Sequence, residues 1–190
     1  SYHDGPIPTP NIDALANRGV EMNRFYSAPT CSPTRASMLT GINSLANGVI
    51  RPYANPRTES YGMPLYHKIL PEYLLEAGYQ TALSGKWHLG MSSDEYLPSS
   101  RGFQQTYGHM NGGIDYYDHS FSGRLDWHRD NIPLVEDGYA TNLIANEAIR
   151  IIKNKDKNKP LFLYVAFNAP HTPIQVENDV MNELLFIEDI

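Results

Sequence analysis

The sequence predicts an α/β protein with a mostly parallel sheet flanked by helices. Helical and strand patterns alternate along the chain, which is typical of such sheets. A continuous apolar run at residues 161–167 is typical of a strand buried on both sides. Three groups of polar residues each follow a predicted strand directly. Because ligands of open α/β sheets bind beyond the carboxyl ends of the strands, we expect these groups to share one rim.

Length, charge and cysteine content narrow the protein class. The chain has 190 residues, 41% of them hydrophobic and 19% charged, so we expect one folded domain. Its formal net charge of -6 argues against nucleic acid as the main partner. The single cysteine excludes an internal disulfide.

The ends of the chain suggest a fragment or a processed form. It begins at Ser1 rather than Met and carries no apolar leader segment. No apolar run approaches the length of a membrane span, so we expect none.

The first predicted elements lead to the only cysteine. Thr9 as cap and Pro10 as first residue begin a helix that Gly19 ends. The β-branched and aromatic residues of 20–28 predict a strand, which brings the chain to Cys31.

The next elements place Cys31 at a strand-to-helix junction. Pro33 occupies the first turn of a second helix, which ends at Gly41. Residues 47–67 are rich in Pro, Gly and Asn and predict a long irregular loop.

A second helix and strand pair leads to Lys86 and His88. Residues 71–77 predict a helix closed by Gly78, and residues 79–84 predict a strand. Residues 91–138 show poor periodicity, so we expect a long excursion over the surface.

The last predicted elements are a helix at 140–155 and the strand at 161–167. One face of this helix carries Leu143, Ile144, Ala148, Ile151 and Ile152. His171 lies just beyond the strand, on a turn stiffened by Pro170 and Pro173.

Cys31 is the first candidate for chemistry. It precedes a helix start and lies near Arg35 in the sequence, and both features favour a thiolate or a bound anion. The alternative is a buried cysteine that packs as a small apolar group.

Lys86, His88 and His171 are the other candidates. In an extended segment Lys86 and His88 point to the same side and could hold one anion together. The alternative is that both are solvated while Trp87 and Leu89 pack inward. For His171 the alternative is a hydrogen-bonding or capping role.

Together these residues resemble the signatures of one family. Residues 31–35, Cys-Ser-Pro-Thr-Arg, resemble the Cys-x-Pro-x-Arg signature of type I sulfatases, and Gly-Lys-Trp-His-Leu-Gly at 85–90 resembles their second signature. Residues 9–13 and the run from Leu161 to His171 are similar to flanking family segments. Residues 97–117 are most similar to the arylsulfatase B-like branch.

The resemblance implies a partial sulfatase catalytic domain over residues 1–190, with an alkaline-phosphatase-like fold incomplete at both ends. The implied activity is hydrolysis of sulfate esters. A maturation enzyme would oxidise Cys31 to formylglycine, whose hydrated aldehyde supplies the nucleophilic oxygen. Its second oxygen can later expel sulfate, which a serine hydroxyl could not do.

The resemblance also implies a role for each site residue. Arg35 holds the formylglycine, Lys86 neutralises the sulfate, and His88 takes the proton that drives the second step. His171 binds the sulfate or helps to protonate the leaving alcohol. These roles fit acid-base and electrostatic catalysis.

The resemblance also implies a divalent cation, usually calcium, in the full-length protein. This chain contains few of the residues that bind it in the family. Of the family's ligands only Cys31, once converted, is present, whereas calcium takes six to eight oxygens. The spacing of Asp4, Asp13 and Asp115 does not suggest replacements. We therefore expect these 190 residues alone to be inactive and to leave sheet edges exposed.

The implied partners are a sulfate ester, with a sulfated glycan among the candidates, and the formylglycine-generating enzyme. Sulfatases of this kind are commonly exported, to the periplasm or the medium, or lysosomal.

Three other functions remain open from the sequence. One is hydrolysis of phosphonate or phosphate esters, because some members of the same superfamily also use a converted cysteine. Another is a noncatalytic homologue or fragment that binds sulfated glycans. The third is a thiol hydrolase that pairs Cys31 with His88 or His171.

Overall fold

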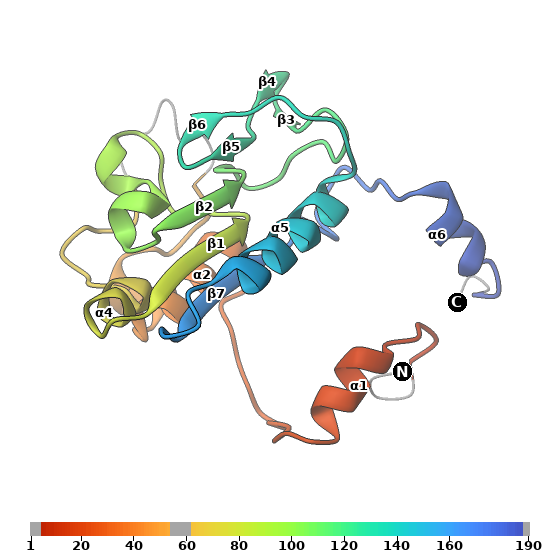
Figure 1. Cartoon of the computed structure of the whole chain (residues 1–190), viewed down its shortest axis with the longest axis horizontal. Helices are drawn as coiled ribbons and strands as arrows, with labels where there is room; N and C mark the ends of the chain where they lie inside the picture. The colour runs from red at the N-terminus through yellow and green to blue at the C-terminus, as the bar shows by residue number, and fades with distance from the viewer. Residues whose placement is uncertain (1–4, 54–61, 188–190) are drawn as a thin grey trace. The chain divides into compact units, whose positions relative to one another are not determined.

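The computed structural model describes residues 5–53 and 62–187, and the chain divides into two compact units. The first unit comprises residues 1–27 and 176–190 and contains the helices α1 (Pro10–Ala16) and α6 (Asn178–Glu183). The second unit, residues 28–175, contains the sheets and the other helices (Figure 1). All five predicted site residues belong to this second unit.

The second unit is built on a five-stranded sheet of order β6-β5-β2-β1-β7. Its strands are β1 (Gln80–Gly85), β2 (Gln105–Gly108), β5 (His128–Arg129), β6 (Ile132–Pro133) and β7 (Leu161–Ala166). β1 pairs in parallel with β2 and β7, whereas β5 and β6 extend the sheet in antiparallel pairing. The α/β prediction is confirmed, with an antiparallel ribbon added to the parallel part.

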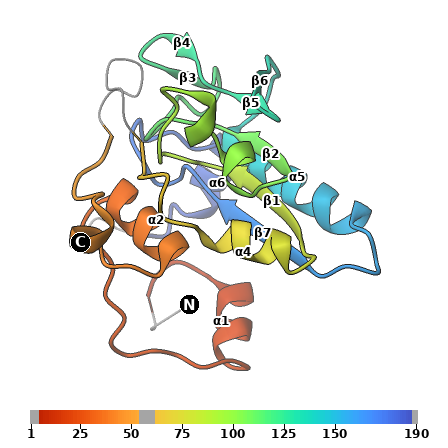
Figure 2. The same ribbon diagram turned by 90° about the vertical axis from the view of Figure 1, so that its left-hand side faces the viewer.

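Helices cover both faces of this sheet. α5 (Ala140–Asn154) lies on one face, and α2 (Cys31–Thr40) lies on the other (Figures 1 and 2). α4 (Leu70–Glu76) contacts both β1 and α2. The shorter elements are α3 (Ser44–Asn47), η2 (Asp94–Tyr96), η3 (Pro98–Arg101) and a hairpin of β3 (Ser120–Phe121) with β4 (Arg124–Leu125).

The two faces of β1 lead to two apolar clusters. Leu83 belongs to the cluster beneath α2, which also includes Trp87 and Phe103. The neighbouring Ser84 points the other way and donates its hydroxyl to the Ile144 carbonyl of α5, at 2.8 Å. This alternation is what a strand between two helical layers requires.

The predicted helices are confirmed, but α1 ends at Ala16 rather than at Gly19, and the Thr9 hydroxyl donates to the Asp13 carboxylate instead of capping the helix. α2 ends at Gly41, whose φ of 69° is favourable only for a residue without a side chain. α4 begins where the Glu72 carboxylate accepts the Ile69 N–H at 2.7 Å. α2 begins at Cys31, so Pro33 lies in its first turn as predicted.

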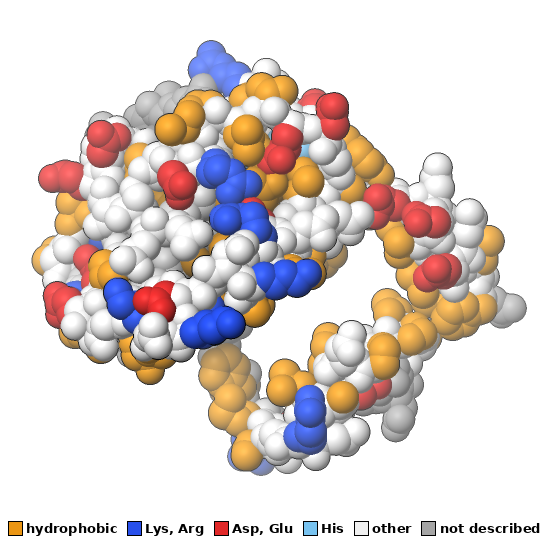
Figure 3. Space-filling view, in the orientation of Figure 1, with side chains coloured by type: hydrophobic (Ala, Val, Ile, Leu, Met, Phe, Trp, Pro, Cys, Tyr) orange, Lys and Arg blue, Asp and Glu red, His pale blue; other side chains and the backbone are white. Residues whose placement is uncertain are grey.

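The buried face of α5 matches its predicted stripe except at one end. Ile144, Ala148 and Ile151 are buried, whereas Ile152 is 53% exposed. Glu147 is buried among them because Arg129 donates to both of its carboxylate oxygens, at 2.8 and 3.1 Å. Lys and Arg side chains gather over α5 on the face shown in Figure 3.

Two sequence predictions are wrong. Residues 20–28 form no strand: no described strand pairs with them, and Val20 is 92% exposed. Residues 91–138 are not a surface excursion, since they contain β2 and such buried side chains as Phe103 and Trp127. Composition could not indicate β2, because its polar sequence Gln-Thr-Tyr-Gly becomes a strand only by pairing with β1.

The last strand, β7, differs from its prediction in burial. It lies at the end of the described sheet and its residues are mostly half-buried, so the prediction that both of its faces are buried is wrong. An exposed sheet edge, in contrast, was expected. None of the described helices is long and apolar enough to cross a membrane.

Candidate active site

Cys31 is fixed by the start of α2. The Thr34 N–H donates to the Thr30 carbonyl at 3.1 Å, and the Thr34 hydroxyl donates to the Ala28 carbonyl at 2.7 Å. Thr30, the N-cap residue, forms no capping bond with its own side chain. The half-buried Cys31 therefore sits at the positive end of a ten-residue helix.

Lys86 and His88 follow β1 on a segment that is hydrogen-bonded on one side to the end of β7 and on the other side to residues 109–110. The Lys86 N–H donates to the Ala166 carbonyl, and the N–H groups of Trp87 and His88 donate to the carbonyls of His109 and Met110, at 2.7, 2.9 and 3.0 Å respectively. The side chain of Trp87, between Lys86 and His88 in the chain, is fully buried. Lys86 and His88 both reach Gly112, so they lie on one side of the segment as predicted.

Although Lys86 and His88 lie on the same side of the segment, neither side chain is exposed to solvent. Lys86 is 3% exposed and His88 is 4% exposed, which argues against the alternative of two merely solvated side chains. The left-handed φ of 59° at His88 is uncommon for a residue with a side chain.

Cys31 and His88 are in direct contact. The Sγ atom of Cys31 lies 3.1 Å from Nδ1 of His88, and Nε2 of the same ring lies 3.1 Å from the Tyr53 carbonyl oxygen. Since a carbonyl can only accept, Nε2 carries the proton and Nδ1 is the acceptor facing Cys31. Burial, together with the nearby Lys86, lowers the pKa of His88 to about 4 and keeps the ring neutral.

Arg35 of α2 forms hydrogen bonds to the segment that follows β1 and to β7. Its guanidinium donates to the Lys86 carbonyl at 2.8 Å and to the Tyr164 hydroxyl at 2.9 Å. It thereby holds α2 against the end of β1 and against β7. Tyr164 is a site neighbour that the sequence placed only in a strand.

Lys86 completes the cationic part of the site. Its ammonium group donates to the Gly112 carbonyl. Burial first, and then the nearby Arg35, lower the pKa of Lys86 to about 8, while Cys31 opposes this shift. Among the described residues no carboxylate forms an ion pair with Lys86 or Arg35, so the pair can attract an anion.

His171 lies on a turn after β7, as its flanking prolines predicted, and its side chain is exposed. Its Nδ1 donates to the Thr172 carbonyl at 2.8 Å, and its own carbonyl accepts the Tyr116 hydroxyl at 2.9 Å. Its charged form would disfavour protonation of His88. His171 therefore lies near the cluster of Cys31, Arg35, Lys86 and His88 without a direct bond to it.

A pair of glycines lies against both histidines. A Cβ atom on Gly112 would lie 2.7 Å from Cε1 of His88, and one on Gly113 would lie 2.5 Å from Nδ1 of His171. Only a residue without a side chain fits at either position. The Gly-Gly dipeptide was visible in the sequence, but nothing local linked it to residues 88 and 171.

A hollow of about 500 Å³ adjoins His171. Its described lining is Gly113, Ile114, Asp115, Ser120, Phe121, Ser122, His171, Thr172 and Pro173. This His171 hollow offers hydroxyl groups, one aromatic side chain and one carboxylate. It provides room for the part of a ligand that extends away from the cations.

The described residues do not fit a calcium ion. Among them no group of three or more His, Cys, Asp or Glu side chains is arranged to hold a metal. The neighbours of Cys31 are nitrogen donors rather than the oxygen ligands that calcium requires. Asp13 accepts from the Thr9 hydroxyl, Asp115 accepts from Gln175, and Asp4 lies outside the described residues.

Fold and geometry together define a class: an α/β protein that places a cysteine and a cationic cluster at the carboxyl ends of its parallel strands. The sequence profile described as Sulfatase matches residues 1–184. The chain belongs to the sulfatase family.

Individual relatives agree with this assignment. The chain is 36% identical over 182 residues to arylsulfatase J of Mus musculus, which covers 92% of the chain and 30% of that protein. It is 31% identical over 188 residues to the arylsulfatase of Klebsiella aerogenes, covering 92% and 40%. The chain thus spans well under half the length of these curated relatives.

Solved structures agree with the fold. The crystal structure titled Ps i-CgsB superposes with a TM-score of 0.84 at 32% identity, over 95% of this chain and 44% of that one. The structure of BT4656 in complex with its substrate D-glucosamine-2-N,6-O-disulfate superposes with a TM-score of 0.75 at 32% identity, over 99% and 35%. The alkaline-phosphatase-like α/β expectation is consistent with both.

Proposed function

We propose that the natural protein, at its full length, hydrolyses sulfate esters with the site built around Cys31. One observation carries the proposal. Cys31, Arg35, Lys86 and His88 form one hydrogen-bonded cluster at the carboxyl end of β1, in a chain of the sulfatase family. Its cations are free of carboxylate partners among the described residues, and a sulfate group has the charge to match them.

The proposal includes conversion of Cys31 to formylglycine, which in sulfatases supplies the hydrated aldehyde oxygen that attacks sulfur. Around it, Lys86 and Arg35 attract the ester's negative charge and stabilise the charge that develops on its oxygens. Arg35 also fixes the start of α2 against β7, which orients residue 31.

His88 suits the role of a general base. Its ring is neutral near pH 7, and its unprotonated Nδ1 faces the side chain of residue 31. The Tyr53 carbonyl holds the other nitrogen and so maintains this tautomer. His88 can therefore take up a proton at Nδ1 without first losing one.

His171 suits the side of the leaving group. It is the most exposed of the five predicted site residues and lines the His171 hollow. An ester whose sulfate contacts Lys86 would extend its alcohol part towards this hollow. Hydroxyl groups and one aromatic ring there fit a carbohydrate ring, and we propose a sulfated glycan or sugar as the substrate class.

The described residues do not supply the ligands of calcium, which the family resemblance leads us to expect in the full-length protein, so no step here is routed through the ion. The maturation enzyme is an implied partner. An exported or lysosomal location stays a prediction from the family resemblance.

The first test is the mass of the peptide that contains Cys31, isolated from the natural host or after co-expression with a formylglycine-generating enzyme. An aldehyde at residue 31 supports the proposal. An unmodified thiol under both conditions argues against it and favours a noncatalytic homologue.

A second test separates two ester chemistries. Rates with an aryl sulfate and with an aryl phosphonate are compared for the full-length protein. Faster hydrolysis of the sulfate is expected, whereas preference for the phosphonate would assign the protein to the related hydrolases.

The contact between Cys31 and His88 also favours a second candidate, a thiol hydrolase. A cysteine 3.1 Å from an acceptor nitrogen of histidine has the geometry of an activated nucleophile. Alkylation of the thiol would abolish that activity, whereas a protein carrying formylglycine would resist it.

A further inference from the structure

Asp126 is a buried carboxylate that none of the proposed catalytic steps uses. It lies between β4 and β5 and is 2% exposed. Its oxygens accept three hydrogen bonds from one short segment: from the N–H groups of Met110 and Asn111, at 3.1 and 2.9 Å, and from the Asn111 side-chain amide, at 2.8 Å. A buried carboxylate is stable only when it is satisfied in this way.

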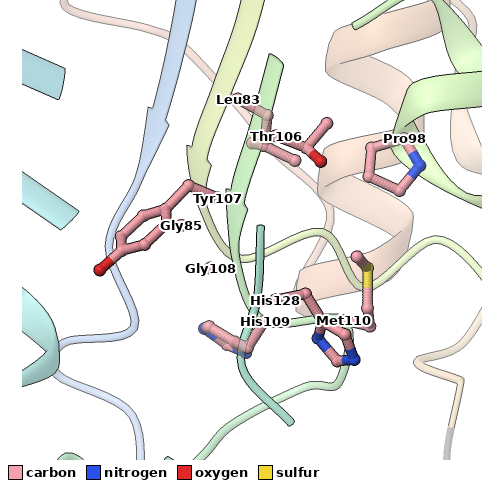
Figure 4. A pocket seen from close by; sticks show the side chains of 9 residues that line it. All are labelled: Leu83, Gly85, Pro98, Thr106, Tyr107, Gly108, His109, Met110 and His128. Carbon is pink, nitrogen blue, oxygen red and sulfur yellow. The ribbon is translucent and has the colours of Figure 1, made fainter. Parts of the chain in front are cut away.

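The segment that Asp126 holds continues from the end of β2. Gly108 pairs with His128 of β5, and residues 109–113 follow directly. Figure 4 shows this strand end, with His109 and Met110 following Gly108 and His128 beside them. His128 also lies 3.6 Å from the carboxylate of Asp126 through its Nδ1.

The same segment contacts the site on its other side. The Met110 carbonyl accepts the His88 N–H at 3.0 Å, and the Gly112 carbonyl accepts the Lys86 ammonium group. The backbone of Gly112 and Gly113 packs against the rings of His88 and His171. Residues 110–113 therefore stand between Asp126 and three of the proposed catalytic side chains.

The type of residue at 126 matters for this arrangement. The three groups that face it from residues 110 and 111 are all N–H donors, so the position requires acceptors only. An ionised carboxylate has two acceptor oxygens, whereas an asparagine would present one oxygen and one NH2 group. The donor–donor contact created by asparagine would push the segment away without a change in volume.

We propose that Asp126 is a positioning residue of the sulfate site, which fixes the Gly112 carbonyl that holds Lys86 and the glycine pair that packs against His88 and His171. This inference rests on the proposed function for its catalytic consequence. Its structural consequence, displacement of residues 110–113, is independent of any activity.

The test compares Asp126→Asn with Glu147→Gln in the full-length protein. Glu147 is a matched control, since it is also a buried carboxylate that accepts several N–H donors, but within the described part of the chain its carboxylate bonds to Arg129 and Arg150 rather than to residues 110–113. Both variants should lower the melting temperature. Three further quantities separate them: kcat and KM for an aryl sulfate, the dissociation constant of inorganic sulfate, and the amide NMR signals of Gly112 and Gly113.

We expect Asp126→Asn to lower kcat/KM by about tenfold to a hundredfold, as ångström-scale displacement of a catalytic group does, and to weaken sulfate binding. Glu147→Gln should leave both quantities near their original values. Equal effects of the two variants on kcat/KM and on sulfate binding would overturn the inference, because Asp126 would then act through stability alone.

The NMR signals keep the inference testable even where the proposed function fails. If the unaltered protein does not hydrolyse aryl sulfates, the proposed function is wrong. Shifted Gly112 and Gly113 signals in Asp126→Asn, absent in Glu147→Gln, would still support positioning. Unchanged signals would contradict it whatever the activity.

Discussion

The Sγ atom of Cys31 and Nδ1 of His88 lie 3.1 Å apart although 57 residues separate them in the chain. The Tyr53 carbonyl fixes the tautomer of the ring from the opposite side. The relationship gives His88 an unprotonated nitrogen directed at the residue that we propose is converted to formylglycine. Catalysis should therefore depend on the imidazole far more than the fold does.

Replacement of His88 by alanine in the full-length protein should lower kcat for an aryl sulfate by about a hundredfold to ten-thousandfold, the usual effect of losing a general base. The melting temperature should change much less, because the Ser32 hydroxyl donates to the backbone carbonyl of residue 88, and the alanine variant retains this hydrogen bond. His119→Gln is the control, since His119 is also buried, but its ring donates to the Gly138 carbonyl and stacks on Trp127 rather than contacting Cys31. Equal losses of activity in both variants would argue against a role for His88.

Gly113→Ala should lower activity by displacing His171. The added methyl group would lie 2.5 Å from Nδ1 of His171, closer than two such atoms can approach. A double-mutant cycle tests the cause: in the His171→Ala background, Gly113→Ala should have little further effect on kcat/KM. Additive losses would show that the methyl group acts on something other than the imidazole.

The charge of the His171 hollow should affect the choice of substrate. Among the described residues that line it none is Lys or Arg, and hydrogen bonds, the Asp118 N–H first, lower the pKa of Asp115 and keep it anionic. A substrate with a second anionic group near the scissile sulfate should therefore react more slowly than a singly sulfated one. Asp115→Asn should narrow the ratio of the two kcat/KM values by about threefold to tenfold. An unchanged ratio would indicate that the alcohol part lies elsewhere.

Glu147→Gln should destabilise the second unit. The carboxylate is 6% exposed and accepts from both Arg129 and Arg150, whose side chains are 39% and 47% exposed. Because water can satisfy the exposed guanidinium groups, we expect the free energy of unfolding to fall by about 1–2 kcal/mol, measured by chemical denaturation. Lys68→Gln removes an ion pair with the exposed Glu76 and the contact of Lys68 with the Tyr73 ring, and it should cost less than about 1 kcal/mol. A similar cost for both would contradict the buried network.

Acidification should destabilise the protein partly through His109. Burial, and then the charges of Lys86 and Arg35, hold the pKa of His109 well below its usual range, so the folded state keeps the ring neutral. The unfolded chain takes up the proton below about pH 6.5, and this contribution to stability is lost as the pH falls further.

His109→Gln should therefore reduce the fall in unfolding free energy between about pH 7 and pH 5, by up to about 1.4 kcal/mol per pH unit. Glutamine keeps a polar group near the Asn111 carbonyl, the contact that the His109 ring makes at 3.1 Å. Denaturation curves at both pH values, compared within each protein, provide the measurement. Parallel pH profiles for the two proteins would contradict the prediction.

Local patterns in the sequence were enough to predict several elements and to indicate five candidate site residues. The apolar stripe of α5, the glycine that ends α2 and the two signatures are each contained in a few consecutive residues. Strands β1 and β7 were also recognisable from their apolar runs. Such features follow from backbone preferences and side-chain periodicity, which operate within a segment.

Other features could not be predicted because they depend on which distant segments meet. β2 has a polar sequence and is a strand through its register with β1 and β5. The apolar run at 20–28 predicted a strand, but no described strand pairs with it. Hydrogen-bonded partners decide strand formation more than composition does.

The sequence by itself determined the family signatures, the presence of four helices and the chemical types at Cys31, Arg35, Lys86, His88 and His171. Only the tertiary structure decided their environment. The burial that makes His88 neutral, the Tyr53 carbonyl that selects its tautomer and the Asp126 carboxylate behind the glycine pair come from remote parts of the chain. Burial and hydrogen bonding set the pKa and orientation of a side chain, and both arise only when the chain is folded.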